Sequence, residues 1–206
     1  MFVLLTVVIA LVSYGLGSLS FAYIITKKLT GDDIRTKGSG NAGFTNAMRV
    51  LPKKWGVLVF ILDILKGLVA VIIGKLLLDD IGGLTAMLFA ILGHMFPFWM
   101  GFRGGKGIST GFGATIAFDW RMAVIMLLLF LIVLLITNHV SAGSIAGAFA
   151  LAFSGMYYHW SLIYVIVFLF AASLVIYKHR GNIERMINGT ESKVFKSRKW
   201  NPLERR

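Results

Sequence analysis

The sequence predicts an all-α membrane protein with seven transmembrane helices, one of them short, and amphipathic helices at the membrane interface. Hydrophobic residues make up 57% of the 206 residues, and the mean hydropathy is +0.80. Residues 2–25 and 55–78 are mostly apolar runs, each about 36 Å long as a helix at ~1.5 Å per residue. A hydrocarbon core of ~30 Å needs about 20 residues to cross, so both runs are long enough to span it.

The distribution of basic residues sets the number and orientation of the spans. The candidate spans are residues 2–25, 56–78, 81–100, 108–119, 121–138, 142–158 and 160–177. Eighteen of the 21 Lys and Arg residues lie in three polar segments, at residues 27–54, 101–107 and 178–206. Basic residues beside span ends stay cytoplasmic. Seven crossings place all three segments inside, with the N-terminus outside and the C-terminus cytoplasmic, whereas six would separate the first segment from the third.

The fourth candidate span, residues 108–119, is too short to cross as a helix alone. About 12 residues reach only ~18 Å, so irregular backbone must extend this span. Such backbone is tolerated at membrane depth only beside protein or a water-filled cavity. We therefore expect a cavity beside the preceding glycine-rich segment.

Composition narrows the class of protein further. Residues 1–206 are expected to form a single membrane domain, with a basic, poorly ordered tail at about residues 192–206. The net charge is +12, and the basic residues that cause it flank the spans. Attraction to anionic lipids therefore explains the charge better than nucleic-acid binding. No nucleic-acid partner is expected. The chain has no cysteine, which excludes disulfides, thiolate metal sites and cysteine acyl-enzymes.

The first polar segment contains the motif DIRTKGSGNAGFTN at residues 33–46. Gly38 and Gly40 allow positive φ, so the chain from Gly38 to Asn41 can form a concave run of N–H groups. If a helix begins near Asn41, that run would bind an anion at the positive helix end. Asn41, Thr45 and Arg49 would then share one polar face. The alternative is an ordinary basic loop followed by a surface helix.

The second segment reads GHMFPFWMGFRGGKG at residues 93–107. Lys106 and the N–H groups of Gly104, Gly105 and Gly107 are candidates for holding a phosphate at the start of the short span. The segment lacks the spacing and the preceding strand of a Walker loop. A flexible turn with a topology-setting lysine is the alternative. We expect His94 to be a packed, hydrogen-bonded histidine rather than a catalytic one.

The third segment reads HRGNIERMINGTE at residues 179–191. His179 and Asn182 lie three residues apart and share a helix face, and Arg185 follows one turn later. The alternative is a tail that anchors at the membrane surface. Asp63 and Lys66, inside the second span, predict an intrahelical ion pair that steadies the cavity wall, since buried charges in spans are usually paired.

Together these three segments resemble the bacterial acyl-phosphate-dependent glycerol-3-phosphate acyltransferases, small integral membrane enzymes of phospholipid synthesis. The resemblance covers essentially the whole chain, and the motifs occur in one order. It implies that the matching positions bind two phosphate-bearing substrates, and Ser39, Arg49, Lys106, His179 and Asn182 are the catalytic candidates. The binding candidates are Gly38, Gly40, Asn41, Thr45, Asn46, Gly104, Gly105, Gly107, Arg185 and Ser144. Residues 138–141 match the family less closely, so Ser144 and its neighbour Ser141 carry less weight.

The resemblance implies transfer of a fatty acyl group from acyl phosphate to the 1-hydroxyl of glycerol 3-phosphate. The products are 1-acylglycerol 3-phosphate and phosphate, formed on the cytoplasmic side of a bacterial cell membrane without a cofactor. Residues 107–111, GISTG, have the GxSxG spacing, but no strand precedes them as in a nucleophile elbow, so a serine acyl-enzyme is not expected. Our hypothesis is direct attack by the glycerol hydroxyl, with the donor phosphate as proton acceptor. His179 is the alternative base, because histidine can titrate near neutral pH.

Two other functional classes remain open from the residues alone. A carrier for a phosphorylated solute would place its binding groups near the midplane, between related repeats. Here the charges gather on one face, and no repeat is visible. A lipid-binding scaffold is the third possibility. Release of phosphate from an acyl phosphate only in the presence of glycerol 3-phosphate separates the three.

Overall fold

The computed structural model describes residues 1–158 and 161–194, and within these ranges every regular element is a helix. The predicted all-α class is confirmed. The elements are α1 (Phe2–Ser18), α2 (Phe21–Thr30), η1 (Ile34–Thr36), α3 (Phe44–Val50), α4 (Lys53–Met95), η2 (Phe98–Met100), α5 (Ile108–Phe118), α6 (Trp120–Thr137), α7 (Val140–Tyr158), α8 (Leu162–Lys178) and α9 (Arg180–Ile187). Most of the predicted basic tail, residues 195–206, lies outside the described residues.

Several of these helices are suited to a bilayer. Among the described residues, the segments long and apolar enough to cross are Phe2–Thr30, Lys53–Met100, Trp120–Thr137 and Val140–Tyr158. Helix α8 qualifies together with α9, as a segment bent by 53°, and α5 is a shorter apolar helix. Large apolar side chains cover the outside of the bundle: Leu128 and Leu135 of α6 are 54% and 69% exposed. Lipid tails are as apolar as leucine, so such a surface is stable in a membrane.

Helix α4 folds back on itself and accounts for two predicted spans. Leu78 and Asp79 have non-helical backbone angles, and the φ of Asp79 is 47°. Gly74 and Gly82 then face each other so closely that a Cβ on either would overlap the backbone of the other. The two legs correspond to the predicted spans 56–78 and 81–100. The second leg ends at Met95 rather than residue 100, and Pro97 follows it.

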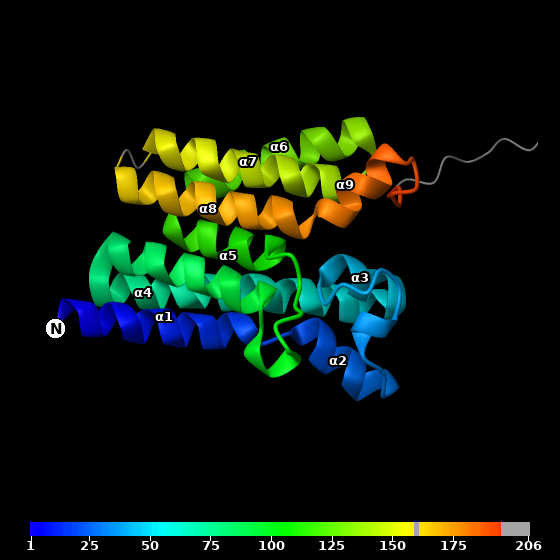
Figure 1. The fold of residues 1–206 in the computed structure, drawn as a ribbon, viewed down its shortest axis with the longest axis horizontal. Coiled ribbons are helices and arrows are strands. Elements are labelled where there is room, and N and C mark those ends of the chain that lie inside the picture. Colours follow the sequence, from blue (N-terminus) through cyan, green and yellow to red (C-terminus); the bar gives the residue numbers. More distant parts are fainter. Residues whose placement is uncertain (159–160, 195–206) are drawn as a thin grey trace, which may run out of the picture.

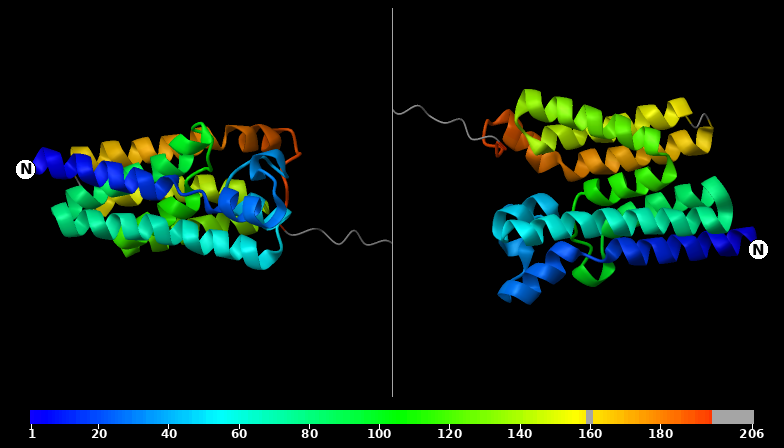
Figure 2. Two further views of the ribbon diagram at one scale, coloured as in Figure 1. Left: turned by 90° about the horizontal axis from the view of Figure 1, so that it is seen from below. Right: turned by 180° about the vertical axis from the view of Figure 1, so that it is seen from behind.

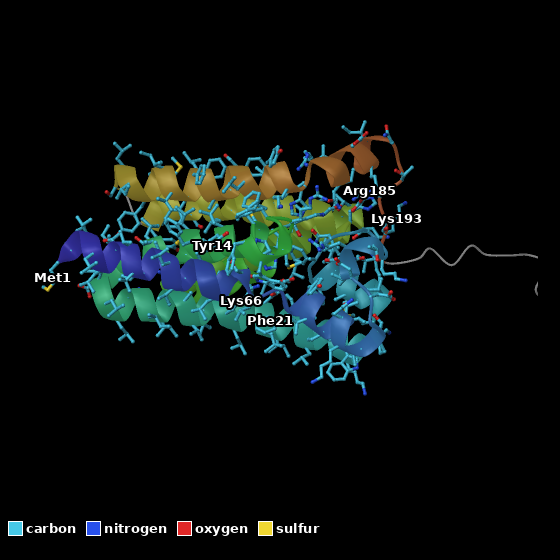
Figure 3. The ribbon with its side chains drawn as sticks, turned by 60° about the horizontal axis from the view of Figure 1, so that its bottom comes forward. Met1, Tyr14, Phe21, Lys66, Arg185 and Lys193 are labelled. Carbon is cyan, nitrogen blue, oxygen red and sulfur yellow. The ribbon has the colours of Figure 1, made fainter. Side chains whose placement is uncertain are left out.

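The first predicted span, residues 2–25, is not one helix. Helix α1 ends at Ser18 and α2 begins at Phe21. Carbonyl groups released at the break have partners elsewhere, since Leu19 O accepts from Lys66 Nζ at 2.6 Å and Ser18 O from Trp99 Nε1 at 2.8 Å. Figure 3 shows Lys66 beside Phe21 at this junction, with the ammonium 5.6 Å from the ring centre. These distant donors stabilise a break that the apolar pattern did not predict.

The long helices run side by side, and the polar segments gather at one end. Figure 1 and Figure 2 place Met1 at one end of the molecule and α2, α3 and α9 at the other. Between these ends run α1, both legs of α4, α5, α6, α7 and α8. Helices α4 and α5 approach closely, since a Cβ on Gly67 would overlap Thr110 O and one on Gly113 would overlap Ile64 O. Small residues of this kind let membrane helices pack backbone to backbone.

Candidate active site

One cavity of about 210 Å³ brings the three polar segments together, as the sequence predicted. It also lies beside the start of the short helix α5, where irregular backbone was expected. Its lining residues are Ser39, Asn41, Gly43, Phe44, Thr45, Asn46, Arg49, Phe60, Asp63, His94, Lys106, Gly107, Ile108, Ser109, Phe130, Val140, Ser141, Ser144, His179, Asn182, Glu191 and Ser192.

The first segment reaches the cavity through a loop that Asn46 organises. Helix α3 begins at Phe44, not near Asn41 as predicted. Asn46 is 1% exposed; its Oδ1 accepts from Ser39 N at 2.8 Å, and its Nδ2 donates to Ile34 O and Lys37 O. The amide of Asn46 is therefore used within the loop, where it shapes the wall of the cavity.

The expected run of free N–H groups is only partly available. Gly38 and Gly40 do have positive φ, 56° and 72°. However, the N–H of Ser39 donates to Asn46, and the N–H of Gly40 donates to Lys37 O at 3.0 Å. A Cβ on Gly38 would overlap Asn46 Oδ1. Gly38 therefore allows the loop to close on Asn46, and it does not line the cavity.

Arg49 and Thr45, one helical turn apart on α3, both line the cavity. Arg49 is exposed, and no carboxylate in the described part of the chain forms an ion pair with it. Asn41 lies just before α3 and lines the same cavity. The predicted polar face is thus assembled, although Asn41 contributes from the loop rather than from the helix.

The glycine-rich loop of the second segment differs from the prediction. The N–H of Gly104 donates to Met95 O at 3.2 Å, and the N–H of Gly105 donates to His94 O at 3.0 Å. These two amides dock the loop on the end of α4 and do not face the cavity as free donors. Gly107, with a φ of 83°, caps α5 and lines the cavity beside Lys106.

Lys106 is the central cation of the cavity. Its Nζ donates to Asn182 Oδ1. Burial lowers the pKa of Lys106 to about 8; the charge of Glu191 opposes this change, and the nearby cations, first Arg185 and then Arg49, add to it. The negative charge of a bound phosphate would favour the protonated form of Lys106 and raise its pKa again.

The third segment enters the site where α8 bends into α9. His179 is 2% exposed, and its Nδ1 lies 2.8 Å from Val175 O. A carbonyl can only accept, so Nδ1 carries the proton and Nε2 is the free acceptor. Burial, and then the charge of Lys106, lowers the pKa of His179 to about 4. The prediction that His179 titrates near neutral pH is therefore wrong for the unliganded protein.

Glu191 is the main residue that the sequence analysis missed. Its carboxylate accepts from Asn182 Nδ2 at 2.7 Å, Ser141 Oγ at 2.9 Å and Arg185 Nε at 2.7 Å. Burial raises its pKa, but these hydrogen bonds and the charge of Arg185 outweigh burial, so the pKa is lowered. The available signal in the sequence was that the basic motif at residues 179–191 ends in an acidic residue, Glu191. Arg185 is correspondingly bound to Glu191 rather than free for a phosphate.

Two further hollows adjoin the cavity. A more open one, of about 490 Å³, shares Ser39, Asn41, Lys106 and Asn182 with the cavity. It adds the basic residues Lys178, Arg180 and Arg185. A narrow apolar groove of about 100 Å³ shares Phe60, Ile108, Ser109, Phe130 and Ser144 with the cavity and continues to Phe112, Met126, Leu127 and Gly147. Ser144 therefore lies where the polar cavity meets the apolar groove, and the weaker candidates Ser141 and Ser144 both line the site.

A buried polar cluster forms the floor of the cavity. Asp63 and Lys66 form the predicted intrahelical pair, with 2.8 Å between Oδ1 and Nζ. His94 is packed and hydrogen-bonded as expected, with its Nδ1 3.1 Å from Thr110 Oγ1. Among residues 1–158 and 161–194, no group of three or more metal-ligating side chains is arranged to hold a metal ion.

Comparison with known proteins places these features in one family. Residues 7–189 match the family model described as glycerol-3-phosphate acyltransferase. The chain is 42% identical over 195 residues to a glycerol-3-phosphate acyltransferase of Clostridioides difficile (strain 630), covering 91% of this chain and 95% of that protein. A protein of the same description from Thermoanaerobacter sp. (strain X514) is 42% identical over 189 residues, with the same coverage.

Solved structures show the same similarity in three dimensions. The crystal structure of PlsY (YgiH), described as an integral membrane glycerol 3-phosphate acyltransferase in its glycerol 3-phosphate form, has a TM-score of 0.86 and 35% identity. The match covers 92% of this chain and 96% of that one. The lysophosphatidic acid form of PlsY has a TM-score of 0.82 and 33% identity, covering 91% and 94%.

Proposed function

The chain belongs to the glycerol-3-phosphate acyltransferase family, and from this premise we propose which substrates it uses and how its residues act. It transfers a fatty acyl group to the 1-hydroxyl of glycerol 3-phosphate, which gives 1-acylglycerol 3-phosphate, in phospholipid synthesis. The donor is an acyl phosphate, and phosphate is the second product. A carrier or a lipid-binding scaffold would not need this acyl-transfer chemistry.

One observation supports this function most strongly: a cationic cavity opens directly into an apolar groove. Arg49 and Lys106 line the cavity, and Phe112 and Met126 line the groove beyond Ser144. An acyl phosphate has the same division into an anionic end and a fatty chain. Its phosphate would lie near Lys106 and its chain between α5, α6 and α7. Glycerol 3-phosphate would enter through the open hollow beside Lys178 and Arg180.

The reaction that fits this arrangement is direct transfer. The 1-hydroxyl oxygen of glycerol 3-phosphate forms a bond to the acyl carbonyl carbon, and the bond from that carbon to the phosphate oxygen breaks. The hydroxyl proton goes to the departing phosphate. The two substrate phosphates together carry ~4 negative charges into the site. Arg49 and Lys106 offset part of this charge. Preorganised cations of this kind stabilise a transition state without further rearrangement.

The residues around His179 fit this route. With Nδ1 bound to Val175 O and a pKa of about 4, His179 is neutral in the free protein and presents Nε2 as an acceptor. In this role it orients the glycerol hydroxyl through a hydrogen bond, while the donor phosphate takes the proton. Ser39 donates a hydrogen bond to substrate. Asn182 is held between Lys106 and Glu191 and fixes the position of the ammonium.

The order of the helices along the chain supports a seven-span topology in a bacterial cell membrane. The spans are α1, the two legs of α4, α5, α6, α7 and α8, with the N-terminus outside. Residues 27–54 and 178–194 lie at the end that carries α2, α3 and α9, opposite Met1, and the loop with residues 101–107 lies in the same half, beside the junction of α1 and α2 (Figure 1). Their basic residues favour the cytoplasmic side for this end.

The function is tested with purified protein in detergent. Phosphate release from an acyl phosphate should depend on added glycerol 3-phosphate, and 1-acylglycerol 3-phosphate should form in equal amount. Phosphate release without the acceptor, or binding of glycerol 3-phosphate without acyl transfer, would contradict the proposed reaction.

A further inference from the structure

His94 lies directly against the glycine-rich loop that carries Lys106. A Cβ added to Gly105 would overlap the Nε2 atom of the imidazole, and its next contacts would be His94 Cε1 at 2.9 Å and Ala42 O at 3.0 Å. Gly105 does not have positive φ, so its backbone could accept an alanine. The imidazole is therefore the first obstacle to a side chain at this position.

The imidazole is itself held by several elements of the bundle. His94 is the last residue but one of α4 and is 6% exposed. Its Nδ1 lies 3.1 Å from Thr110 Oγ1 on α5 and 3.7 Å from Asp63 Oδ1 on the first leg of α4. Asp63 is fixed in turn by Lys66, which also donates to Leu19 O at the break between α1 and α2. The ring is thus connected to α1, α4 and α5.

The loop and the ring form one unit. The carbonyl of His94 accepts from Gly105 N, and the next carbonyl, Met95 O, accepts from Gly104 N and from Lys178 Nζ at 3.0 Å. Lys106 follows at once and points to Asn182 in the cavity. The glycine amides do not face a phosphate, so Gly105 must be glycine for another reason, and contact with the imidazole supplies it.

We propose that His94 is a positioning residue for acyl transfer: its ring supports Gly105 and so fixes where Lys106 meets a substrate phosphate. This inference rests on the proposed function and assigns His94 a place in the same site. His94 does not transfer a proton in this role, because its Nε2 is packed against Gly105.

The contact predicts that the effects of substituting Gly105 and His94 depend on each other. We would compare the native protein, Gly105→Ala, His94→Ala and the double variant, measuring kcat and the KM for both substrates. Gly105→Ala should raise the KM of at least one phosphate substrate about tenfold or more, the effect of losing a hydrogen bond to a charged group. In the His94→Ala background the same substitution should change KM by less than about threefold, since contacting residues give non-additive effects.

Gly15→Ala in α1 is the matched control, because a Cβ there meets nothing within 4 Å. It should leave KM and kcat unchanged and should not lower the Tm, because alanine is more favourable than glycine inside a helix. If His94→Ala does not fold, His94→Asn takes its place, since asparagine keeps an amide near Thr110 and removes the far side of the ring. It should lessen the effect of Gly105→Ala in the same way.

Binding of inorganic phosphate separates this inference from the proposed function. Phosphate should raise the Tm of the native protein more than that of Gly105→Ala or of His94→Ala, because a ligand stabilises the folded state that binds it. If the native protein binds phosphate but transfers no acyl group, the proposed function fails while the role of His94 is still tested. An equal effect of Gly105→Ala in both backgrounds, or an unchanged KM in His94→Ala, overturns the role of His94.

Discussion

Glu191→Gln is expected to weaken the site, because the carboxylate organises three neighbours. Asn182, Ser141 and Arg185 all donate to it. A carboxamide accepts only through its oxygen, and its NH₂ group would face a donor. A hydrogen bond to a charged group contributes ~1.5–3 kcal/mol. Reaction requires these three neighbours in their native positions. The free energy of one lost hydrogen bond then adds to the activation barrier and lowers kcat/KM by about 10- to 150-fold.

The same substitution should move the alkaline limb of the pH profile to lower pH. Burial lowers the pKa of Lys106 to about 8, and the charge of Glu191 opposes that change. Without the carboxylate, the pKa of Lys106 falls further. The lysine must be protonated to attract a phosphate, so kcat/KM should fall as the pH rises through this pKa. That fall is expected near pH 8 in the native protein and at lower pH in the variant.

The measurement is kcat/KM across neutral to alkaline pH at constant ionic strength, with phosphate release as the readout. Asp80→Asn is the control: it removes a carboxylate that pairs with Lys75 at the opposite end of the bundle. Its profile should coincide with that of the native protein. Coincident alkaline limbs for Glu191→Gln and the native protein would refute the link between Glu191 and Lys106.

Three further predictions test other parts of the account. Arg49→Ala and Lys106→Ala should each lower kcat/KM by at least about tenfold with an unchanged Tm, and near-normal turnover in both would remove them from the site. Gly147→Leu should shift the preferred donor to shorter acyl chains, because a Cβ there meets its nearest atom, Met126 O, at an ordinary 3.5 Å and the rest of the side chain enters the groove. At ~0.8 kcal/mol per buried methylene, long and short donors should differ clearly in KM, whereas Phe153→Leu, at an exposed position on the same helix, should change nothing. An N-terminal reporter should lie outside and a C-terminal one in the cytoplasm, and finding both on one side would contradict seven spans.

The sequence predicted the helical class and the meeting of the three polar segments. Both depend on long apolar runs and on the basic segments between them. A run of apolar residues forms a helix in lipid, since every backbone group must be satisfied within the segment. The basic residues then sort the ends of the spans. The pairing of Asp63 with Lys66 followed from local spacing alone, and the structure confirms it.

The errors concern contacts between segments far apart in the chain. The break after Ser18 is stabilised by Lys66 and Trp99, which no local pattern connects to it. The amides of Gly104 and Gly105 looked free in the sequence, but the end of α4 accepts both. The role of Glu191 depends on Ser141, fifty residues away, as well as on Asn182 and Arg185. Such partners become visible only when the helices are packed.

Intact-mass analysis of the protein after incubation with acyl phosphate alone tests the direct route most directly. The chain has no cysteine, and the donor phosphate can take the hydroxyl proton itself. Direct transfer therefore predicts an unmodified mass with donor alone and product only after glycerol 3-phosphate is added. A mass increase of one acyl group, lost when glycerol 3-phosphate is added, would contradict direct transfer and identify a covalent intermediate, with Ser39 as the first position to examine.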